Sequence, residues 1–171
     1  MQVFLIRHPR PMIASGHCYG QLDVDCEDPV PIAARLRQQL PAATPIISSP
    51  LRRARCLAEA LGPDIDIDAR LSEISFGAWE GRPWDAIERS ALDAWAADIL
   101  HFAPPDGESV ADLQGRVLDF ARTLTARDLP RVALVSHAGV MRVLLGHWKQ
   151  LPVPTWTQLQ FGFGSITQIE L

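Results

Sequence analysis

Two short stretches of the chain each place a histidine directly after a run of apolar residues. Arg7 and His8 follow the apolar run at 3–6, and His137 lies just beyond the run at 132–135. A continuous run of aliphatic residues that ends at turn residues predicts a strand buried on both faces. Imidazole serves as a nucleophile, an acid or a base in enzymes, so both strand ends are candidate reactive positions.

A third apolar run, at 46–49, ends in two serines and leads into a segment that carries Arg53. Because ligands bind at the carboxyl ends of parallel strands, we expect all three endings to lie at one edge of a sheet. Arginine binds phosphate through paired hydrogen bonds, and helix N-termini, here expected after Pro50 and Gly139, attract anions. These residues together predict a phosphate site with a histidine nucleophile.

The elements that must position these residues alternate between strands and helices. We expect helices at 32–40, 51–61, 84–100 and 109–126 and after residue 139, a short edge strand at 65–67, one or two strands within 159–169, and long loops at 9–31 and 69–82. This alternation predicts an α/β fold, a three-layer α/β/α sandwich around a mainly parallel sheet. The length of 171 residues fits a single domain over 1–171.

Composition narrows the possible partners. The net charge of −4 argues against a general nucleic-acid-binding protein, and no apolar segment reaches membrane-spanning length. Lys149 is the single lysine among 16 basic side chains, so an anion site must use arginine. The three cysteines include no C-x-x-C pair, which argues against a zinc finger or a disulfide framework. No signal peptide precedes the first strand, so we expect a cytoplasmic protein.

Five segments, in order along the chain, resemble the motifs of the histidine phosphatase superfamily, also called phosphoglycerate-mutase-like. They are 5–8 (LIRH), 48–54 (SSPLRRA), 71–81 (LSEISFGAWEG), 107–109 (GES) and 136–139 (SHAG). Within that superfamily, 16–24 (GHCYGQLDV) and 79–84 (WEGRPW) are most similar to the α-ribazole phosphatases of cobalamin synthesis. The resemblance covers nearly the whole chain and implies a phosphoglycerate-mutase-like fold.

The resemblance also implies roles for matching residues. His8 would attack phosphorus and carry the phosphoryl group, while Arg7, Arg53 and His137 would bind its oxygens. Glu73 would protonate the leaving oxygen and then activate water. Proton transfer by such a group contributes about 10²–10⁴-fold in rate. No metal or other cofactor is expected, because the arginines supply the positive charge.

Other positions are expected to contact the substrate or to support the site. Tyr19, Gly20 and Ala138 are expected to contact phosphate or substrate. Glu80 lies in the same loop as the candidate acid, and we expect it to be structural. Glu108 is interpreted as a carboxylate that favours the start of a helix.

The leading hypothesis is therefore a phosphomonoesterase that acts through phosphohistidine, with α-ribazole 5′-phosphate or a related cobalamin precursor as substrate. A broad-specificity sugar-phosphate phosphatase and a cofactor-dependent phosphoglycerate mutase are alternatives with the same fold. A non-catalytic phosphoprotein-binding module is disfavoured, because such a module would not need the acid, Glu73. A metallohydrolase that uses His8 and His137 lacks an H-x-H or H-E-x-x-H pair. The expected partner is a small phosphomonoester rather than nucleic acid or a membrane, and the oligomeric state stays open.

Overall fold

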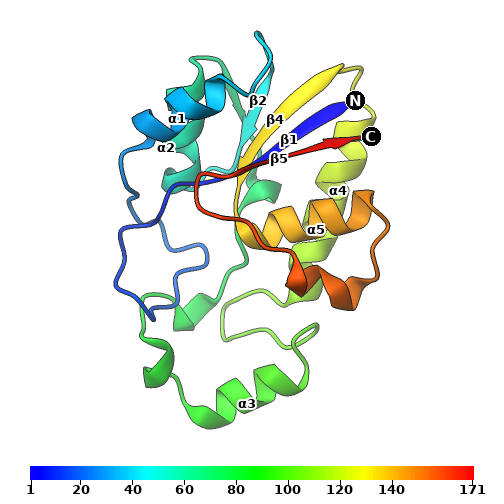
Figure 1. Ribbon diagram of the computed structural model, residues 1–171. Helices are drawn as coiled ribbons and strands as arrows, with labels where there is room; N and C mark the ends of the chain where they lie inside the picture. The colour runs from blue at the N-terminus through cyan, green and yellow to red at the C-terminus, as the bar shows by residue number, and fades with distance from the viewer.

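The computed structural model describes residues 1–171 and contains one five-stranded sheet in the order β3-β2-β4-β1-β5 (Figure 1). Its strands are β1 (Gln2–Arg7), β2 (Ile46–Ser48), β3 (Ile65–Ile67), β4 (Arg131–Ser136) and β5 (Ile166–Glu170). The first four run parallel and β5 runs antiparallel beside β1. The prediction of a mainly parallel α/β sheet with an edge strand at 65–67 is confirmed.

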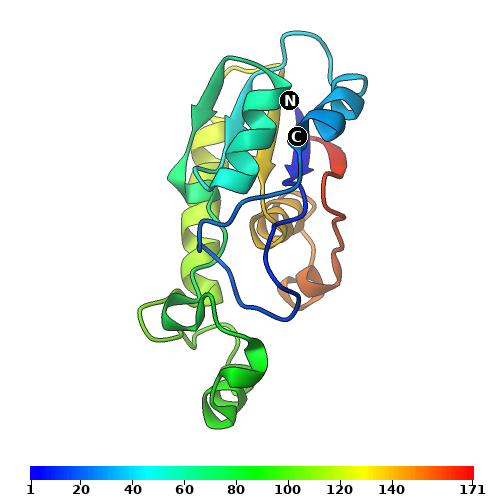
Figure 2. The same cartoon turned by 90° about the vertical axis from the view of Figure 1, so that its left-hand side faces the viewer.

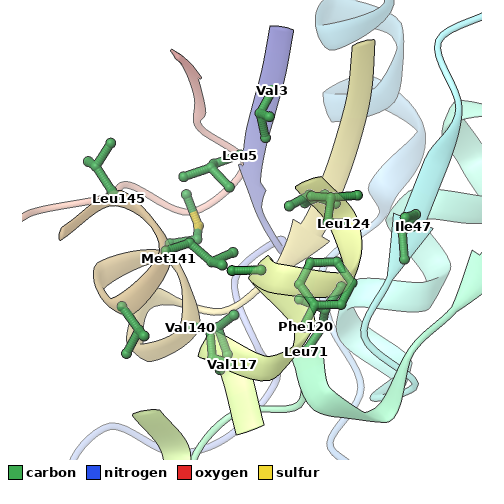
Figure 3. Close-up of a cluster of buried hydrophobic side chains, with 14 of the residues drawn as sticks. Val3, Leu5, Ile47, Leu71, Val117, Phe120, Leu124, Val140, Met141 and Leu145 are labelled. Carbon is green, nitrogen blue, oxygen red and sulfur yellow. The ribbon is translucent and has the colours of Figure 1, made fainter. Parts of the chain in front are cut away.

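Helices cover both faces of the sheet. The helices α1 (Pro29–Arg37) and α2 (Arg52–Leu61) lie on one face, and α4 (Val110–Thr125) and α5 (Ala138–Trp148) lie on the other (Figures 1 and 2). Successive residues of a strand point to opposite faces. Leu5 therefore packs with α4 and α5 (Figure 3), while Phe4 packs with α1 and α2. No helix is both long and apolar enough to cross a bilayer.

Strand register brings the three predicted endings together. Arg7 of β1 lies opposite Ser136 of β4, and Ser48 of β2 lies opposite Val135. Beyond these pairs, the backbone N–H of His8 donates to the carbonyl of Ser136 at 3.1 Å. The residues that follow β2, β4 and β1 therefore line one edge of the sheet, as expected.

The first helix differs from its predicted range of 32–40. It begins at Pro29, because the Asp28 carboxylate accepts a hydrogen bond from Val30 N at 3.0 Å and caps the helix. Proline suits the first turn, where its missing N–H is not needed. Leu40 lies beyond the helix end and packs on the core from the following turn.

The helix predicted at 84–100 is also shorter than expected. A 3₁₀ turn (Trp84–Ala86) is followed by extended backbone, and α3 spans only Arg89–Ala97. Extension at Ile87 inserts its side chain against Trp79 and Cys18 in a small third cluster. α3 has no buried residue and lies apart from the sheet (Figure 2).

The C-terminal segment forms one strand, one of the two alternatives predicted, but this strand begins at Ile166 and the residues from 159 to 165 are not part of it. A 3₁₀ helix (Val153–Gln158) precedes irregular backbone that reaches β5 only at Ile166. Arginine side chains bind the carbonyls of this segment: Arg142 Nε donates to Leu159 O and Arg7 donates to Phe161 O. These bonds replace the pairing that a strand would need.

Candidate active site

His8 lies at the carboxyl end of β1 with only 2% of its surface exposed. Its Nδ1 is 2.5 Å from the carbonyl oxygen of Pro9. A carbonyl only accepts hydrogen bonds, so Nδ1 carries the proton and Nε2 keeps its lone pair. Burial, followed by the nearby charge of Arg53, lowers the pKa of His8 to about 3. His8 is therefore a neutral imidazole with a free nucleophilic nitrogen at neutral pH.

His137 follows β4 and is fully buried, with its ring centroid 5.0 Å from that of His8. Its Nε2 lies 2.8 Å from Ser49 Oγ, which also accepts from Leu51 N. The Ser49 hydroxyl can then give its own proton to Nε2, which favours the tautomer with hydrogen on Nδ1. Burial lowers the pKa of His137 well below its ordinary value, with His8 the next cause, so this ring is neutral too.

Arg7 ends β1 and is held against the C-terminal segment. Its guanidinium donates to Phe161 O at 2.6 Å, and its Cζ lies 3.8 Å from the centre of the Phe163 ring. Burial lowers the pKa of Arg7, while Tyr19 and Glu73 oppose that shift. Stacking and a carbonyl bond thus fix the orientation of this cation beside His8.

Arg53 is fully buried in the first turn of α2. Its two terminal nitrogens donate to Leu22 O at 3.0 Å and Gly20 O at 2.6 Å, and its Cζ lies 5.3 Å from the centre of the Tyr19 ring. A Cβ on Gly20 would lie 2.4 Å from Ile74 O, so only glycine fits this turn. Tyr19 and Gly20 therefore support Arg53 from the long first loop.

Three buried side-chain nitrogens at this edge have no hydrogen-bond partner: Arg7 Nε, Arg53 Nε and His137 Nδ1. A buried donor without an acceptor costs about 1–3 kcal/mol, more for a charged group. Phosphoryl oxygens are strong acceptors, and charge-assisted bonds to them are the stronger class. These three orphaned donors beside His8 fit a phosphoryl group.

Glu73 lies in the loop after β3, with its side chain at the N-terminus of α5. Its Oε2 accepts from Gly139 N at 3.1 Å, and its Oε1 accepts from Ile74 N at 3.0 Å. A Cβ on Gly139 would lie 2.2 Å from Glu73 Oε1, so glycine makes room for the carboxylate. The candidate acid is thus placed at the same sheet edge as the two histidines, while Ala138 is the first residue of α5.

Carboxylates of the chain itself approach both helix N-termini that were expected to attract the substrate anion. Glu73 takes the N–H of Gly139 in α5, and Asp23 accepts from Arg52 N at the start of α2 at 2.7 Å. Both helix N-termini are therefore approached by carboxylates of the chain itself. One N–H group at each of these two helix ends is therefore already used within the chain.

Two further glutamates near the site, Glu80 and Glu108, make structural contacts. Glu80 Oε1 accepts from Gln21 N at 2.7 Å and Phe76 N at 2.8 Å, as a structural role requires. Glu108 does not cap a helix, in contrast to its interpretation from the sequence. Ser109 and Asp112 form the capping box of α4, and Glu108 instead pairs with Arg116 at 2.7 Å.

The segment 159–163 contributes to the site in a way that its sequence does not indicate. Phe163 lies 5.5 Å from His8 between ring centroids and stacks on Arg7. Arg142 of α5 holds Leu159 O at 3.1 Å. The alternation of aromatic residues in this segment matches strand periodicity, and no local signal indicates that its carbonyls bind arginines.

The two buried histidines predict a specific loss of stability in mild acid. In the folded protein they stay neutral, whereas in the unfolded chain they take up protons below a pKa of about 6.5. The unfolded state then binds more protons, so the free energy of unfolding should fall as pH drops from 7 to 5, with a limiting slope of about 1.4 kcal/mol per pH unit for each histidine. Urea unfolding at pH 7, 6 and 5 measures this slope.

The matched control replaces both buried histidines with glutamine, which does not titrate. The doubly substituted protein should show a flatter pH dependence over the same range. Equal slopes for the two proteins would contradict the assignment of His8 and His137 as neutral in the folded state.

Comparison with known proteins agrees with this arrangement. A family model described as the histidine phosphatase superfamily (branch 1) matches residues 3–171. A glucosyl-3-phosphoglycerate phosphatase of Mycolicibacterium vanbaalenii is 33% identical over an alignment of 192 positions that covers 99% of this chain and 83% of that protein.

Solved structures show the same likeness. A mycobacterial glucosyl-3-phosphoglycerate phosphatase has a TM-score of 0.81 and 31% identity, covering 98% of this chain and 88% of that chain. The α-ribazole phosphatase of Shigella flexneri has a TM-score of 0.88 and 26% identity, covering 100% of this chain and 91% of that chain. The fold over the full length is therefore that of histidine phosphatases.

Proposed function

The chain belongs to the histidine phosphatase superfamily, and we propose that it hydrolyses a small phosphomonoester through a phosphohistidine formed on His8. The observation that carries this proposal is the state of His8: neutral, buried, and with Nε2 left free by the contact of Nδ1 with Pro9. The orphaned nitrogens of Arg7, Arg53 and His137 lie at the same edge. We also propose that residues 1–171 form one catalytic domain, which works in the cytoplasm.

In the first step, His8 Nε2 attacks phosphorus and the bond from phosphorus to the leaving oxygen breaks. Arg7, Arg53 and His137 donate hydrogen bonds to the phosphoryl oxygens and stabilise the charge of the transition state. Glu73, protonated for this step, gives its proton to the leaving oxygen. In the second step, the Glu73 carboxylate takes a proton from water, the resulting hydroxide attacks phosphorus, and phosphate leaves His8 free.

The first substrate candidate is α-ribazole 5′-phosphate or a related cobalamin precursor. It is supported by the resemblance of 16–24 and 79–84 and by the match in fold to the Shigella enzyme over the full chain. The second candidate is a sugar phosphate of the glucosyl-3-phosphoglycerate type, which the higher identity to the mycobacterial enzymes favours.

Phosphate release from a panel of monoesters tests the proposal. The panel should contain α-ribazole 5′-phosphate, glucosyl-3-phosphoglycerate, phosphoserine and a nucleoside monophosphate, with 3-phosphoglycerate included to detect isomerisation. Release of phosphate from at least one of these compounds is the expected result. The compound with the highest kcat/KM then identifies the substrate class. Conversion of 3-phosphoglycerate into its isomer without release of phosphate would instead support a mutase.

We expect phosphatase activity to survive excess EDTA. No three His, Cys, Asp or Glu side chains are grouped in a way that could hold a metal ion, and Arg7 and Arg53 supply positive charge at the site. Activity should therefore change by less than about twofold after chelation, since arginines take the role that a Lewis-acid metal has in other phosphatases. Loss of activity that added Mg²⁺ or Zn²⁺ restores would contradict this expectation.

A further inference from the structure

Arg116 of α4 is a part-buried arginine that grips the loop carrying Glu73. Its Nε and one terminal nitrogen bind the two carboxylate oxygens of Glu108 at 2.7 and 3.0 Å. Its terminal nitrogens also donate to three main-chain carbonyls, those of Arg70, Ser72 and Glu73, at 2.7–2.9 Å. These contacts use all five N–H groups that a guanidinium offers.

Gln21, from the long first loop, reaches the same point. Its Nε2 donates to Glu73 O at 2.9 Å and lies 3.3 Å from Glu108 Oε2. Glu73 O therefore accepts from both Gln21 and Arg116, which fills both of its lone pairs. The neighbours of Gln21 in the chain, Gly20 and Leu22, are the residues whose carbonyls Arg53 binds.

We propose that Arg116 and Gln21 are positioning residues for leaving-group protonation: they fix the main chain at Glu73 and tie it to the loop that Arg53 holds. This inference rests on the proposed function, in which Glu73 is the acid. Neither side chain contacts the unpaired nitrogens of Arg7, Arg53 and His137 that are proposed to bind phosphate. Each therefore acts through Glu73.

The geometry explains why this position needs so many bonds. Glu73 is anchored at both ends, by Gly139 N at its carboxylate and by Arg116 and Gln21 at its carbonyl. Proton transfer requires the heavy atoms to lie within about 2.6–3.2 Å. A displacement of 1 Å at a catalytic group can cost about 10²-fold in rate. A loop segment outside helix and sheet needs such side-chain anchors to hold that precision.

The experiment compares two substrates for each variant by single-turnover kinetics of the phosphorylation step. An alkyl phosphate needs protonation of its leaving oxygen, whereas p-nitrophenyl phosphate needs little. Gln21→Met keeps the length of the side chain but removes the donor, and Arg116→Lys keeps the charge but cannot reach three carbonyls and a carboxylate. We expect each to slow the alkyl phosphate by about tenfold or more and p-nitrophenyl phosphate by less than about twofold.

Asp119→Asn is the matched control. Asp119 also lies on α4 and also ties that helix to the segment before Glu73, through a 2.6 Å bond with Arg70. It makes no contact with Glu73, so its replacement should leave the ratio of the two substrate rates unchanged. Thermal unfolding of every variant separates loss of fold from loss of position.

Glu73→Gln, measured in parallel, separates failure of the positioning role from failure of Glu73 as the acid. If Glu73→Gln lowers the alkyl-phosphate rate selectively but Gln21→Met and Arg116→Lys lower both substrates equally or not at all, the positioning role is overturned. If Glu73→Gln itself shows no selectivity while His8 is still phosphorylated, the assignment of the acid fails and the positioning role fails with it. In the Glu73→Gln background, Gln21→Met should add no further selectivity.

Discussion

Replacing His8 with alanine is expected to lower turnover of every phosphomonoester substrate by about 10⁴-fold or more. The variant keeps Arg7, Arg53 and His137, so it should still bind phosphate. It lacks the neutral imidazole whose Nε2 is left free by the contact of Nδ1 with Pro9 O. Steady-state phosphate release measures the loss, and phosphate inhibition or protection against unfolding shows that binding remains.

Direct detection of the intermediate gives the same prediction a second readout. Wild-type enzyme mixed with labelled substrate and quenched in alkaline denaturant should carry the phosphoryl group on His8. Quenching must avoid acid, because the phosphorus–nitrogen bond of phosphohistidine hydrolyses there. His17→Ala is the control and should label normally, because the one side-chain hydrogen bond of His17 is exposed and joins Nδ1 to Ser15 O at 3.4 Å. A labelled phosphoryl group on Ser49, or full activity in His8→Ala, would contradict the proposal.

The pKa of His8 also sets the pH range over which attack is possible. Because burial and the charge of Arg53 lower that pKa to about 3, the nucleophile stays deprotonated from neutral pH down to about pH 4. Loss of the phosphorylation rate between pH 7 and pH 5 would therefore have to come from another group. A titration of His8 seen near its ordinary pKa in the free enzyme would contradict the environment described above.

The convergence of the site was predictable because it follows from topology. Apolar runs that end in Arg7-His8, Ser49 and His137 indicate buried parallel strands, and parallel strands place their endings at one edge. The register of β2, β4 and β1 confirms this. No side-chain detail is needed for that argument, only the repetition of a strand that ends in polar residues.

The support around the site was not predictable for an equally physical reason. Arg116 reaches Glu73 O across 43 residues of sequence, and Phe163 reaches His8 from the far end of the chain. Such contacts depend on how loops fold over the sheet, and loops lack the periodicity that shows strands and helices. The carboxylates of Asp23 and Glu73, which each accept from one N–H at a helix N-terminus, also come from distant segments.

Replacing Glu73 with glutamine is expected to slow phosphorylation by substrates with poor leaving groups by about 10²-fold or more. Glutamine retains an oxygen that can accept from Gly139 N, so the loop should keep its position. It cannot deliver the proton that an alkoxide leaving group requires. p-Nitrophenyl phosphate should be affected far less at this step, because its leaving group needs little protonation.

Glu80→Gln is the control, because Glu80 lies in the same loop and is the other candidate for the acid. Its Oε1 accepts from Gln21 N and Phe76 N, and an amide oxygen accepts those bonds as well. The change should therefore cost little on either substrate. Single-turnover rates for both variants on both substrates separate the two glutamates. A leaving-group-dependent loss in Glu80→Gln but not in Glu73→Gln would mean that the proton comes from the other carboxylate, and the 3.1 Å bond between Glu73 and Gly139 would then be structural only.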